Sequence, residues 1–123
     1  QLPAFKLRDY TSANKVTVRD VLSHRVGVAH NTYDRDLENN APFPLLAERL
    51  SSAPMACTPG DCYAYQNVAF SLIGDLVFAA TGDFYSHQVE KRIFHPLGMY
   101  NSTYGREALE ASASWASQRS RTD

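Results

Sequence analysis

The sequence has no excess of charge of either sign. Its 123 residues carry 12 Lys and Arg against 13 Asp and Glu, a formal net charge of −1. Nucleic-acid binding rests on a clustered surplus of Lys and Arg that neutralises phosphates, so this balance argues against a nucleic-acid partner. Neither end carries a run of like charges that would mark an interaction tail.

A long hydrophobic run is also missing. The longest apolar stretch, residues 68–80, has 13 residues and is interrupted by Ser71 and Asp75. A membrane-spanning helix needs about 20 apolar residues, so no membrane segment is expected in this chain. The chain begins with Gln-Leu-Pro and not with Met, which fits a mature protein or a piece of a longer one.

No segment alternates apolar and polar residues in the way that a half-buried strand does. Apolar residues instead recur at helical spacing between Gly and Pro residues. We therefore predict an all-α fold of four or five helices with long loops. The expected helices cover residues 17–25, about 44–51, 68–81, 84–94 and 106–113, and residues 28–41 are expected to form a loop.

Small polar residues and a glycine mark the expected helix ends. Thr17 and Asp20 have the spacing of a capping box. Asn67 and Asp83 are expected N-caps, and Gly27 is an expected left-handed stop after the first helix. These signals are local, so they predict where helices begin and end and not how the helices pack.

Apolar positions predict which helix faces are buried. In the first helix the apolar face consists of Val18, Val21 and Leu22. The helix over residues 68–81 is apolar nearly all round, which predicts that it lies centrally in the core. Gly74 within it predicts close helix packing, because Gly in a helix costs about 1 kcal/mol relative to Ala.

Residues 57–66 form a turn-rich segment in front of this helix. Pro59-Gly60 suits the central positions of a type II turn. Tyr65 and Asn67, two residues apart, can project to the same side of an extended chain. A phenol beside cations can act as a general base, and an amide can orient a lysine and a carbonyl together. The alternative is that Tyr65 packs in the core and Asn67 only caps the helix.

Four ordered stretches resemble the superfamily of serine β-lactamases and penicillin-binding proteins, in particular class C β-lactamases, D-alanyl-D-alanine carboxypeptidases and related esterases. Residues 17–28 look like the family's helix that ends in Leu-Leu-Thr-His-x-Ser-Gly-Leu. Residues 59–67 look like the family's Pro-Gly loop with its Tyr-x-Asn motif, and residues 68–82 look like the buried helix that ends in Thr-Gly. Residues 92–103 look like the family's Ile-Phe-x-Pro-Leu-Gly-Met-x-x-Thr segment. Together they span residues 17–104.

The resemblance implies acyl transfer through a serine ester. In the family, a Ser-x-x-Lys motif supplies the nucleophile, and a Tyr-x-Asn motif supplies a base and an orienting amide. A Lys-Thr-Gly-type strand binds the carboxylate of the substrate. Carried over, Tyr65 is the base or proton shuttle, and Asn67 holds the lysine and the acyl amide. Gln66 between them receives no role. Tyr65 and Asn67 are therefore the expected catalytic residues.

The chain departs from the family pattern in three places. It contains no Lys-Thr-Gly, since residues 80–82 read Ala-Thr-Gly at a helix end. Its one Ser-x-x-Lys string begins at Ser12, in what we expect to be a solvated polar loop directly before the first helix, whereas the family's nucleophile lies further upstream. Val26 replaces the usual Ser before the glycine. We therefore interpret residues 1–123 as a single helical subdomain of a larger α/β hydrolase.

This interpretation predicts part of a serine acyl hydrolase of the β-lactamase or D,D-peptidase type, inactive without its nucleophile. The alternative is a non-catalytic binding module derived from the same family. The expected partners are the missing sheet domain and a small acyl substrate (a β-lactam, a D-alanyl peptide or an ester). Self-association through an exposed apolar patch is also expected, as is export of the parent protein. No cofactor is expected.

Only two cysteines are present, Cys57 and Cys62, and they flank the Pro-Gly turn. A reversing turn can bring their Cα atoms within the distance that a disulfide requires, and the resemblance to exported proteins permits one. Two free thiols are the alternative. A zinc site with histidines is a further alternative that the spacing disfavours, the candidates being His24, His30, His87 and His95. No metal site is therefore expected.

Overall fold

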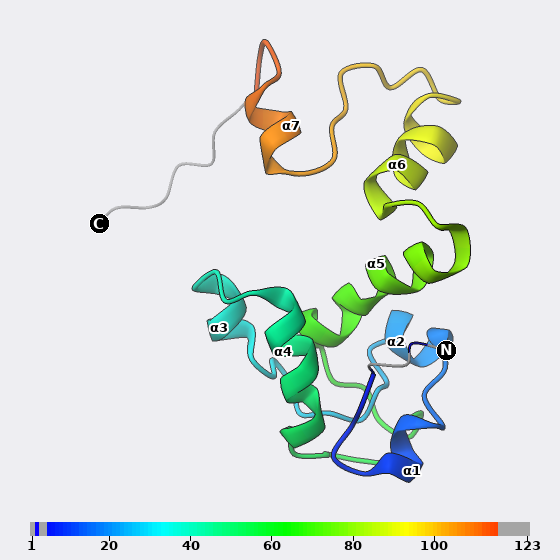
Figure 1. The fold of residues 1–123 in the computed structure, drawn as a ribbon, viewed down its shortest axis with the longest axis vertical. Coiled ribbons are helices and arrows are strands. Elements are labelled where there is room, and N and C mark those ends of the chain that lie inside the picture. The colour runs from blue at the N-terminus through cyan, green and yellow to red at the C-terminus, as the bar shows by residue number, and fades with distance from the viewer. Residues whose placement is uncertain (1, 3–4, 116–123) are drawn as a thin grey trace. The chain divides into compact units, whose positions relative to one another are not determined.

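The computed structural model describes residue 2 and residues 5–115. These residues form helices and no strand; the single β-bridge among them pairs Val28 with Met55. The prediction of an all-α chain is confirmed for this part. The chain divides into two compact units, Gln1–Thr81 and Gly82–Asp123, and Figure 1 shows the helices of each.

The first unit consists of short helices packed on one longer helix. α5 (Asn67–Thr81) is contacted by α2 (Val18–Leu22), α3 (Asp34–Glu38) and α4 (Phe43–Arg49). The 3-10 turn η1 (Leu50–Ser52) continues α4, and α1 (Tyr10–Ala13) precedes α2. Ten buried apolar residues form the core of this unit: Leu7, Val21, Val26, Val28, Leu46, Leu50, Ala53, Val68, Ala69 and Leu72.

The local signals at the start of α2 are confirmed, but the helix is shorter than predicted. Thr17 is the N-cap, its side chain accepts from the Asp20 N–H, and Asp20 accepts from the Thr17 N–H. The first residue after α2 with a left-handed backbone conformation is His24, with φ 56°. Gly27, with φ 96°, comes three residues later. The predicted stop at Gly27 is therefore wrong, because the chain has already left the helix at Leu22.

Two predicted loops contain helices. α3 lies inside residues 28–41, which carry too few apolar residues to indicate a helix from the sequence. Ser12 lies in α1 and is only 8% exposed, and its Oγ donates to Asp9 Oδ2 at 2.7 Å. The expectation of a solvated Ser12 is wrong, since its hydroxyl donates to the Asp9 carboxylate, which also accepts from the Thr11 and Ser12 N–H groups at the start of α1.

The prediction that α5 lies centrally in the core holds for one face of its first half only, since Phe70 is 40% exposed. Val68, Ala69 and Leu72 are buried, but Phe78 is 48% exposed. Gly74 has no neighbour within 4 Å of where a Cβ would lie, so it does not mark close packing. In α2 only Val21 is buried, while Val18 and Leu22 are half exposed.

The second unit contains α6 (Tyr85–Val89), the π-helical η2 (Glu90–Phe94) that continues it, and α7 (Arg106–Glu110). The predicted helix over residues 84–94 is thus confirmed. The N-cap is Phe84 and not Asp83, which the sequence predicted; the Asp83 carboxylate accepts from the Phe84 N–H and contacts the side chains of His87 and Gln88. These bonds hold the pKa of Asp83 below its usual value, chiefly through the Gln88 amide.

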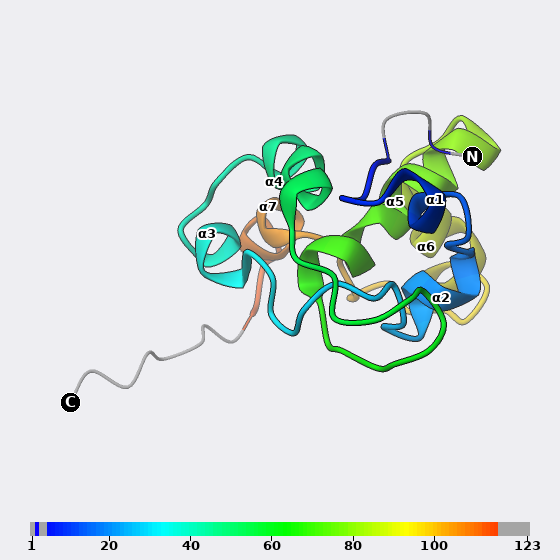
Figure 2. The ribbon, with the colours of Figure 1, turned by 90° about the horizontal axis from the view of Figure 1, so that it is seen from below.

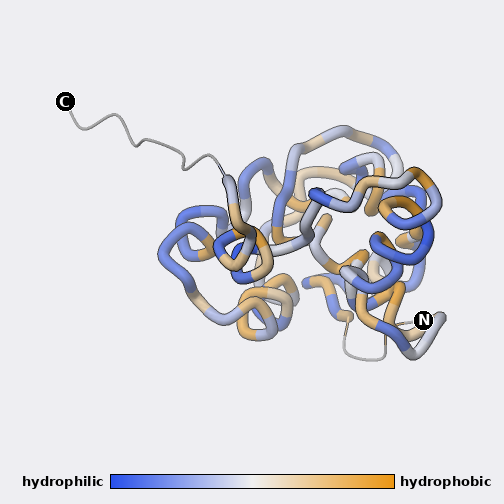
Figure 3. The backbone as a smooth tube through the Cα atoms, turned by 90° about the horizontal axis from the view of Figure 1, so that it is seen from above, coloured by the Kyte–Doolittle hydropathy of each residue, from blue (hydrophilic) through white to orange (hydrophobic). Residues whose placement is uncertain are grey.

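No single helix among the described residues is both long and apolar enough to cross a membrane; only α5 joined with α6 and η2 reaches the required length and composition. Figure 3 shows hydrophobic and hydrophilic positions interspersed along the backbone trace.

Candidate functional site

Two connecting segments lie against each other in the first unit: residues 24–31 after α2, and residues 55–66 before α5. Figure 2 shows them side by side. The Gly27 carbonyl accepts from the Ala56 N–H at 2.7 Å, and the Arg25 carbonyl accepts from the Gly60 N–H at 2.8 Å. Main-chain hydrogen bonds therefore join the two segments although each lacks regular secondary structure.

Gly27 permits this close approach. A Cβ at this position would lie 2.5 Å from the Cys57 carbonyl oxygen, and the φ of Gly27 is 96°. Gly60, with φ 91°, lies in the predicted turn, which is closed by a bond from the Asp61 N–H to the Thr58 carbonyl at 3.0 Å. The third residue of a type II turn must have positive φ, and here that residue is Gly60. The prediction of a type II turn at Pro59-Gly60 is therefore confirmed.

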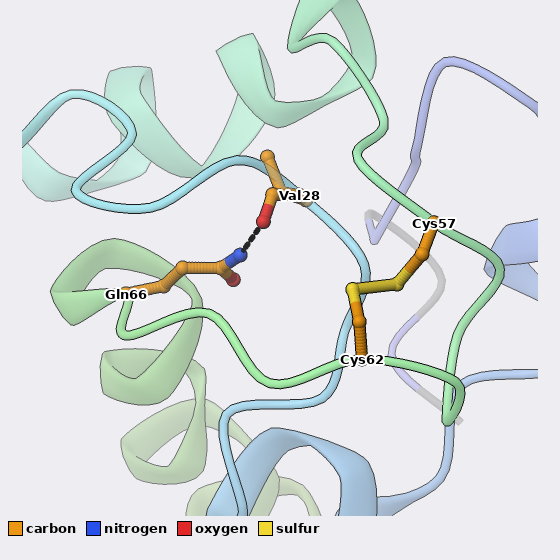
Figure 4. Close-up of a disulfide and its surroundings, with 4 residues drawn as sticks. All are labelled: Val28, Cys57, Cys62 and Gln66. Atoms are coloured by element: carbon orange, nitrogen blue, oxygen red, sulfur yellow. Dashed lines mark hydrogen bonds between the residues drawn. A yellow bond between two sulfur atoms is a disulfide. The ribbon is translucent and has the colours of Figure 1, made fainter.

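Cys57 and Cys62 form a disulfide across this turn, with their Cα atoms 6.2 Å apart. Both sulfurs are therefore bonded to each other and are not zinc ligands. No group of three or more His, Cys, Asp or Glu within the described ranges could hold a metal ion. The disulfide closes the loop that leads to Tyr65 (Figure 4).

Tyr65 lies at the surface, with its backbone held on both sides. Its carbonyl accepts from the Asn31 N–H at 2.9 Å, and the preceding Ala64 N–H donates to the His24 carbonyl at 2.9 Å. Tyr65 as a whole is 42% exposed. A phenol placed this way is available to another molecule or another part of a longer chain, so the alternative that Tyr65 is a core residue does not describe its position.

Asn67 is the first residue of α5, and its side chain reaches another helix. Nδ2 donates to Oδ2 of Asp34 in α3 at 2.9 Å. The other carboxylate oxygen, Asp34 Oδ1, is enclosed and has no hydrogen-bond partner among the described residues. Asn67 thus binds a carboxylate 33 positions earlier, and no bond from its side chain to the backbone of α5 is found among the described residues, so the predicted capping is not what its amide does.

Gln66, to which the sequence assigned no role, is the buried member of the motif. It is 2% exposed, and its Nε2 donates to the Val28 carbonyl, as Figure 4 shows. Its backbone N–H donates to His24 Nδ1 at 3.2 Å. Successive side chains of an extended segment point to opposite sides, so burying Gln66 leaves Tyr65 and Asn67 on the other side, nearer to solvent.

His24 lies just after α2, and its ring contacts this motif. Its ring lies 4.6 Å from the Tyr65 ring and 5.0 Å from the Phe70 ring, measured between centroids. Sequence reasoning missed the roles of His24, Gln66 and Asp34. No local pattern marks them, since each bond joins residues more than 30 positions apart.

Backbone strain is concentrated around the same site. Of the four non-glycine residues with positive φ in the described chain, three lie between positions 24 and 33: His24, Asn31 and Tyr33. His24 and Asn31 bond to the segment around Tyr65, and Tyr33 directly precedes Asp34. Strained conformations of this kind persist only where surrounding contacts hold them, and they cluster at functional sites.

Comparison with known proteins places this geometry in context. A sequence model of the family described as Beta-lactamase matches residues 2–123. "Penicillin-binding protein 4" of Amycolatopsis lactamdurans is 30% identical over 112 residues, which cover 88% of this chain and 29% of that protein. The "D-alanyl-D-alanine-carboxypeptidase/endopeptidase AmpH" of Escherichia coli K12 is 42% identical over 55 residues, 45% of this chain and 14% of that protein.

A third relative comes from a fungus. The "Unguisins hydrolase ungD'" of Aspergillus campestris is 27% identical over 103 residues, 81% of this chain and 19% of that protein. The chain therefore spans less than a third of the length of each of these relatives.

Proposed function

Because this chain belongs to the beta-lactamase family, we propose that it supplies the Tyr-x-Asn part of the site of a serine acyl hydrolase. In this proposal Tyr65 is the general base or proton shuttle, and Asn67 holds a lysine and the acyl amide of the substrate. The geometry of the motif carries the proposal. The backbone at Tyr65 is bound on both sides, its phenol is exposed, and the Asn67 amide is oriented by a carboxylate.

The nucleophile, the carboxylate-binding strand and the sheet domain belong, in this proposal, to the remaining length that the relatives have. Ser12 is not a suitable nucleophile, because its Oγ is buried and donates to Asp9. Residues 1–123 alone are then inactive, since removing the nucleophile of such a unit abolishes nearly all of its acceleration. The substrates are acyl compounds such as β-lactams, D-alanyl peptides or esters.

Export of the parent protein and contact with its sheet domain complete the proposal. The Cys57–Cys62 disulfide supports export, because disulfides persist in oxidising compartments. Exposed apolar side chains support a covering partner, for example Phe78 in the first unit and Leu97 in the second, which are 48% and 70% exposed. We expect the isolated chain to self-associate, and a monomer mass by light scattering at high concentration would contradict this.

The catalytic proposal is tested first on residues 1–123, where nitrocefin and p-nitrophenyl esters should show no turnover that a serine-directed reagent blocks. In the complete polypeptide that contains this chain, Tyr65→Phe should lower kcat by a factor of about 10² to 10⁴, the usual share of a general base. Tyr63→Phe is the matched control, because Tyr63 is 67% exposed and lies outside the motif. Equal activities of the two variants would favour a non-catalytic binding module.

A further inference from the structure

We infer that His24 is a positioning residue that fixes Tyr65 through one neutral tautomer of its imidazole. This inference rests on the proposed role of Tyr65 and adds a residue outside the Tyr-x-Asn motif. His24 follows α2 and lies in the left-handed region, with φ 56°. Non-glycine residues rarely adopt this conformation unless surrounding contacts hold it.

His24 bonds to the residues on both sides of Tyr65. Its carbonyl oxygen accepts from the Ala64 N–H at 2.9 Å, and its Nδ1 accepts from the Gln66 N–H at 3.2 Å. A single residue thus holds the backbone directly before and directly after the tyrosine. The left-handed backbone of His24 places its carbonyl and its ring so that both bonds form together.

The ring of His24 also packs on the side chain that it positions. The imidazole and Tyr65 ring centroids are 4.6 Å apart at an interplanar angle of 35°, and the Phe70 ring of α5 stacks on the imidazole at 5.0 Å and 21°. Such centroid distances lie in the range of favourable aromatic pairs. The imidazole therefore links the exposed phenol to the first turn of α5.

The hydrogen bond from Gln66 specifies the tautomer of a neutral His24 ring. A ring nitrogen that accepts an N–H bond carries no proton, so a neutral imidazole must hold its proton on Nε2. Asparagine offers the closest substitute, because its Oδ1 is attached at Cγ, as Nδ1 is, and Asn tolerates the left-handed region better than most residues. Alanine offers neither the acceptor nor the ring.

The test uses NMR on the ¹⁵N-labelled 123-residue chain. Long-range ¹H–¹⁵N correlation should show His24 as the Nε2–H tautomer. In His24→Ala the Gln66 amide should exchange with solvent about two- to tenfold faster, as expected for loss of one hydrogen bond, and the Tyr65 ring resonances should shift. In His24→Asn the protection of Gln66 should return, while the Tyr65 ring resonances remain shifted because the ring contact is still missing.

His30→Ala is the matched control, because the exposed His30 ring lies 6.3 Å from the Tyr65 ring and makes no bond to Gln66. The amide signal of Leu72, which is buried in α5, reports whether each variant is folded.

If His24→Ala unfolds, the inference is tested by the Gln66 exchange rate in His24→Asn and by the tautomer of His24 in the unmodified chain. An Nδ1–H tautomer, unchanged Gln66 exchange in a folded His24→Ala, or no rescue by Asn would overturn the inference. A failed activity test with Tyr65→Phe would leave these readouts unaffected, so the two proposals fail separately.

Discussion

The amide Nδ2 of Asn67 donates to Oδ2 of Asp34 at 2.9 Å, across 33 residues of sequence. An ionised carboxylate only accepts hydrogen bonds, so this contact turns the NH2 group of Asn67 toward Asp34. The carbonyl oxygen of Asn67 is then left to accept from another donor. That orientation suits the proposed role of Asn67, which requires an acceptor for a lysine ammonium.

A double-mutant cycle measures this contact. Asp34→Ala and Asn67→Ala should each lower the free energy of unfolding, and their coupling should be about 1.5–3 kcal/mol, as for a hydrogen bond to a charged group. Urea unfolding followed by circular dichroism gives the four values. Asp36→Ala is the control on the same helix, because its ion pair with Arg49 is exposed and worth at most about 1 kcal/mol. Additive effects of Asp34→Ala and Asn67→Ala would show that the contact is not made in solution.

Two glycines give opposite predictions for the same substitution. Gly27→Ala should destabilise the chain by about 2–4 kcal/mol, because φ is 96° and the new Cβ would meet the Cys57 carbonyl at 2.5 Å. Gly74→Ala should stabilise it by about 0.5–1 kcal/mol, since Gly74 lies within α5 with open space around it. Urea midpoints of the two variants measure both effects. A destabilising Gly74→Ala would mean that α5 is more tightly packed there.

Gln66 offers a test of burial. Gln66→Leu removes the bond to the Val28 carbonyl and should cost about 1–3 kcal/mol, the penalty of leaving a buried acceptor unpaired. Gln66→Glu should cost more at neutral pH, because burying a carboxylate is unfavourable, and less in acid, where the protonated group can donate. Thermal unfolding of both variants at two pH values measures the difference. A Gln66→Glu variant whose stability relative to wild type is independent of pH would contradict the buried position.

The capping box at α2 predicts a pH dependence with a definite sign. The Thr17 hydroxyl, and next the Thr17 N–H, bind Asp20 and lower its pKa from 3.8. A lowered carboxylate pKa stabilises the folded state above the unfolded pKa, and this stabilisation is lost as the pH falls through the folded pKa. Thr17→Ala should therefore cost about 1 kcal/mol at pH 6 and less below pH 3.8. Unfolding curves at pH 6 and pH 3 test this, and an equal cost at both would show that Asp20 takes no part.

The disulfide predicts a simple chemical result. Alkylation of the unreduced chain should leave its mass unchanged, whereas prior reduction should add two groups. The Cys57→Ser, Cys62→Ser double variant should lose about 2 kcal/mol or less, because the closed loop is short. Two alkylations without reductant would establish free thiols instead.

Local signals in the sequence predicted much of the fold. The capping box of Thr17 and Asp20 and the turn at Gly60 depend on neighbours within a few residues, and both are confirmed. α3 was missed because its sequence, DRDLE, has little apolar periodicity and the helix contacts α4 and α5. A one-dimensional pattern does not contain such contacts.

At the candidate site, too, local signals could be read from the sequence and contacts between distant segments could not. Tyr65 and Asn67 were identified from their spacing and its resemblance to a family motif, and their roles remain predictions. His24, Gln66 and Asp34 were not identified, because their contribution depends on which distant segment each side chain meets. Burial of Gln66 in particular contradicts its polar character, and it becomes understandable only when the Val28 carbonyl lies beside it.

The bonds that hold the motif also set the order in which it can form. They connect residues 66 and 67 to residues 24, 28 and 34, at separations of 42, 38 and 33 residues. Closing loops of this length costs entropy that local helix formation does not, so such contacts form late in folding. The final position of Tyr65 therefore depends on contacts that form only once residues 24–34 and residues 66–67 have come together.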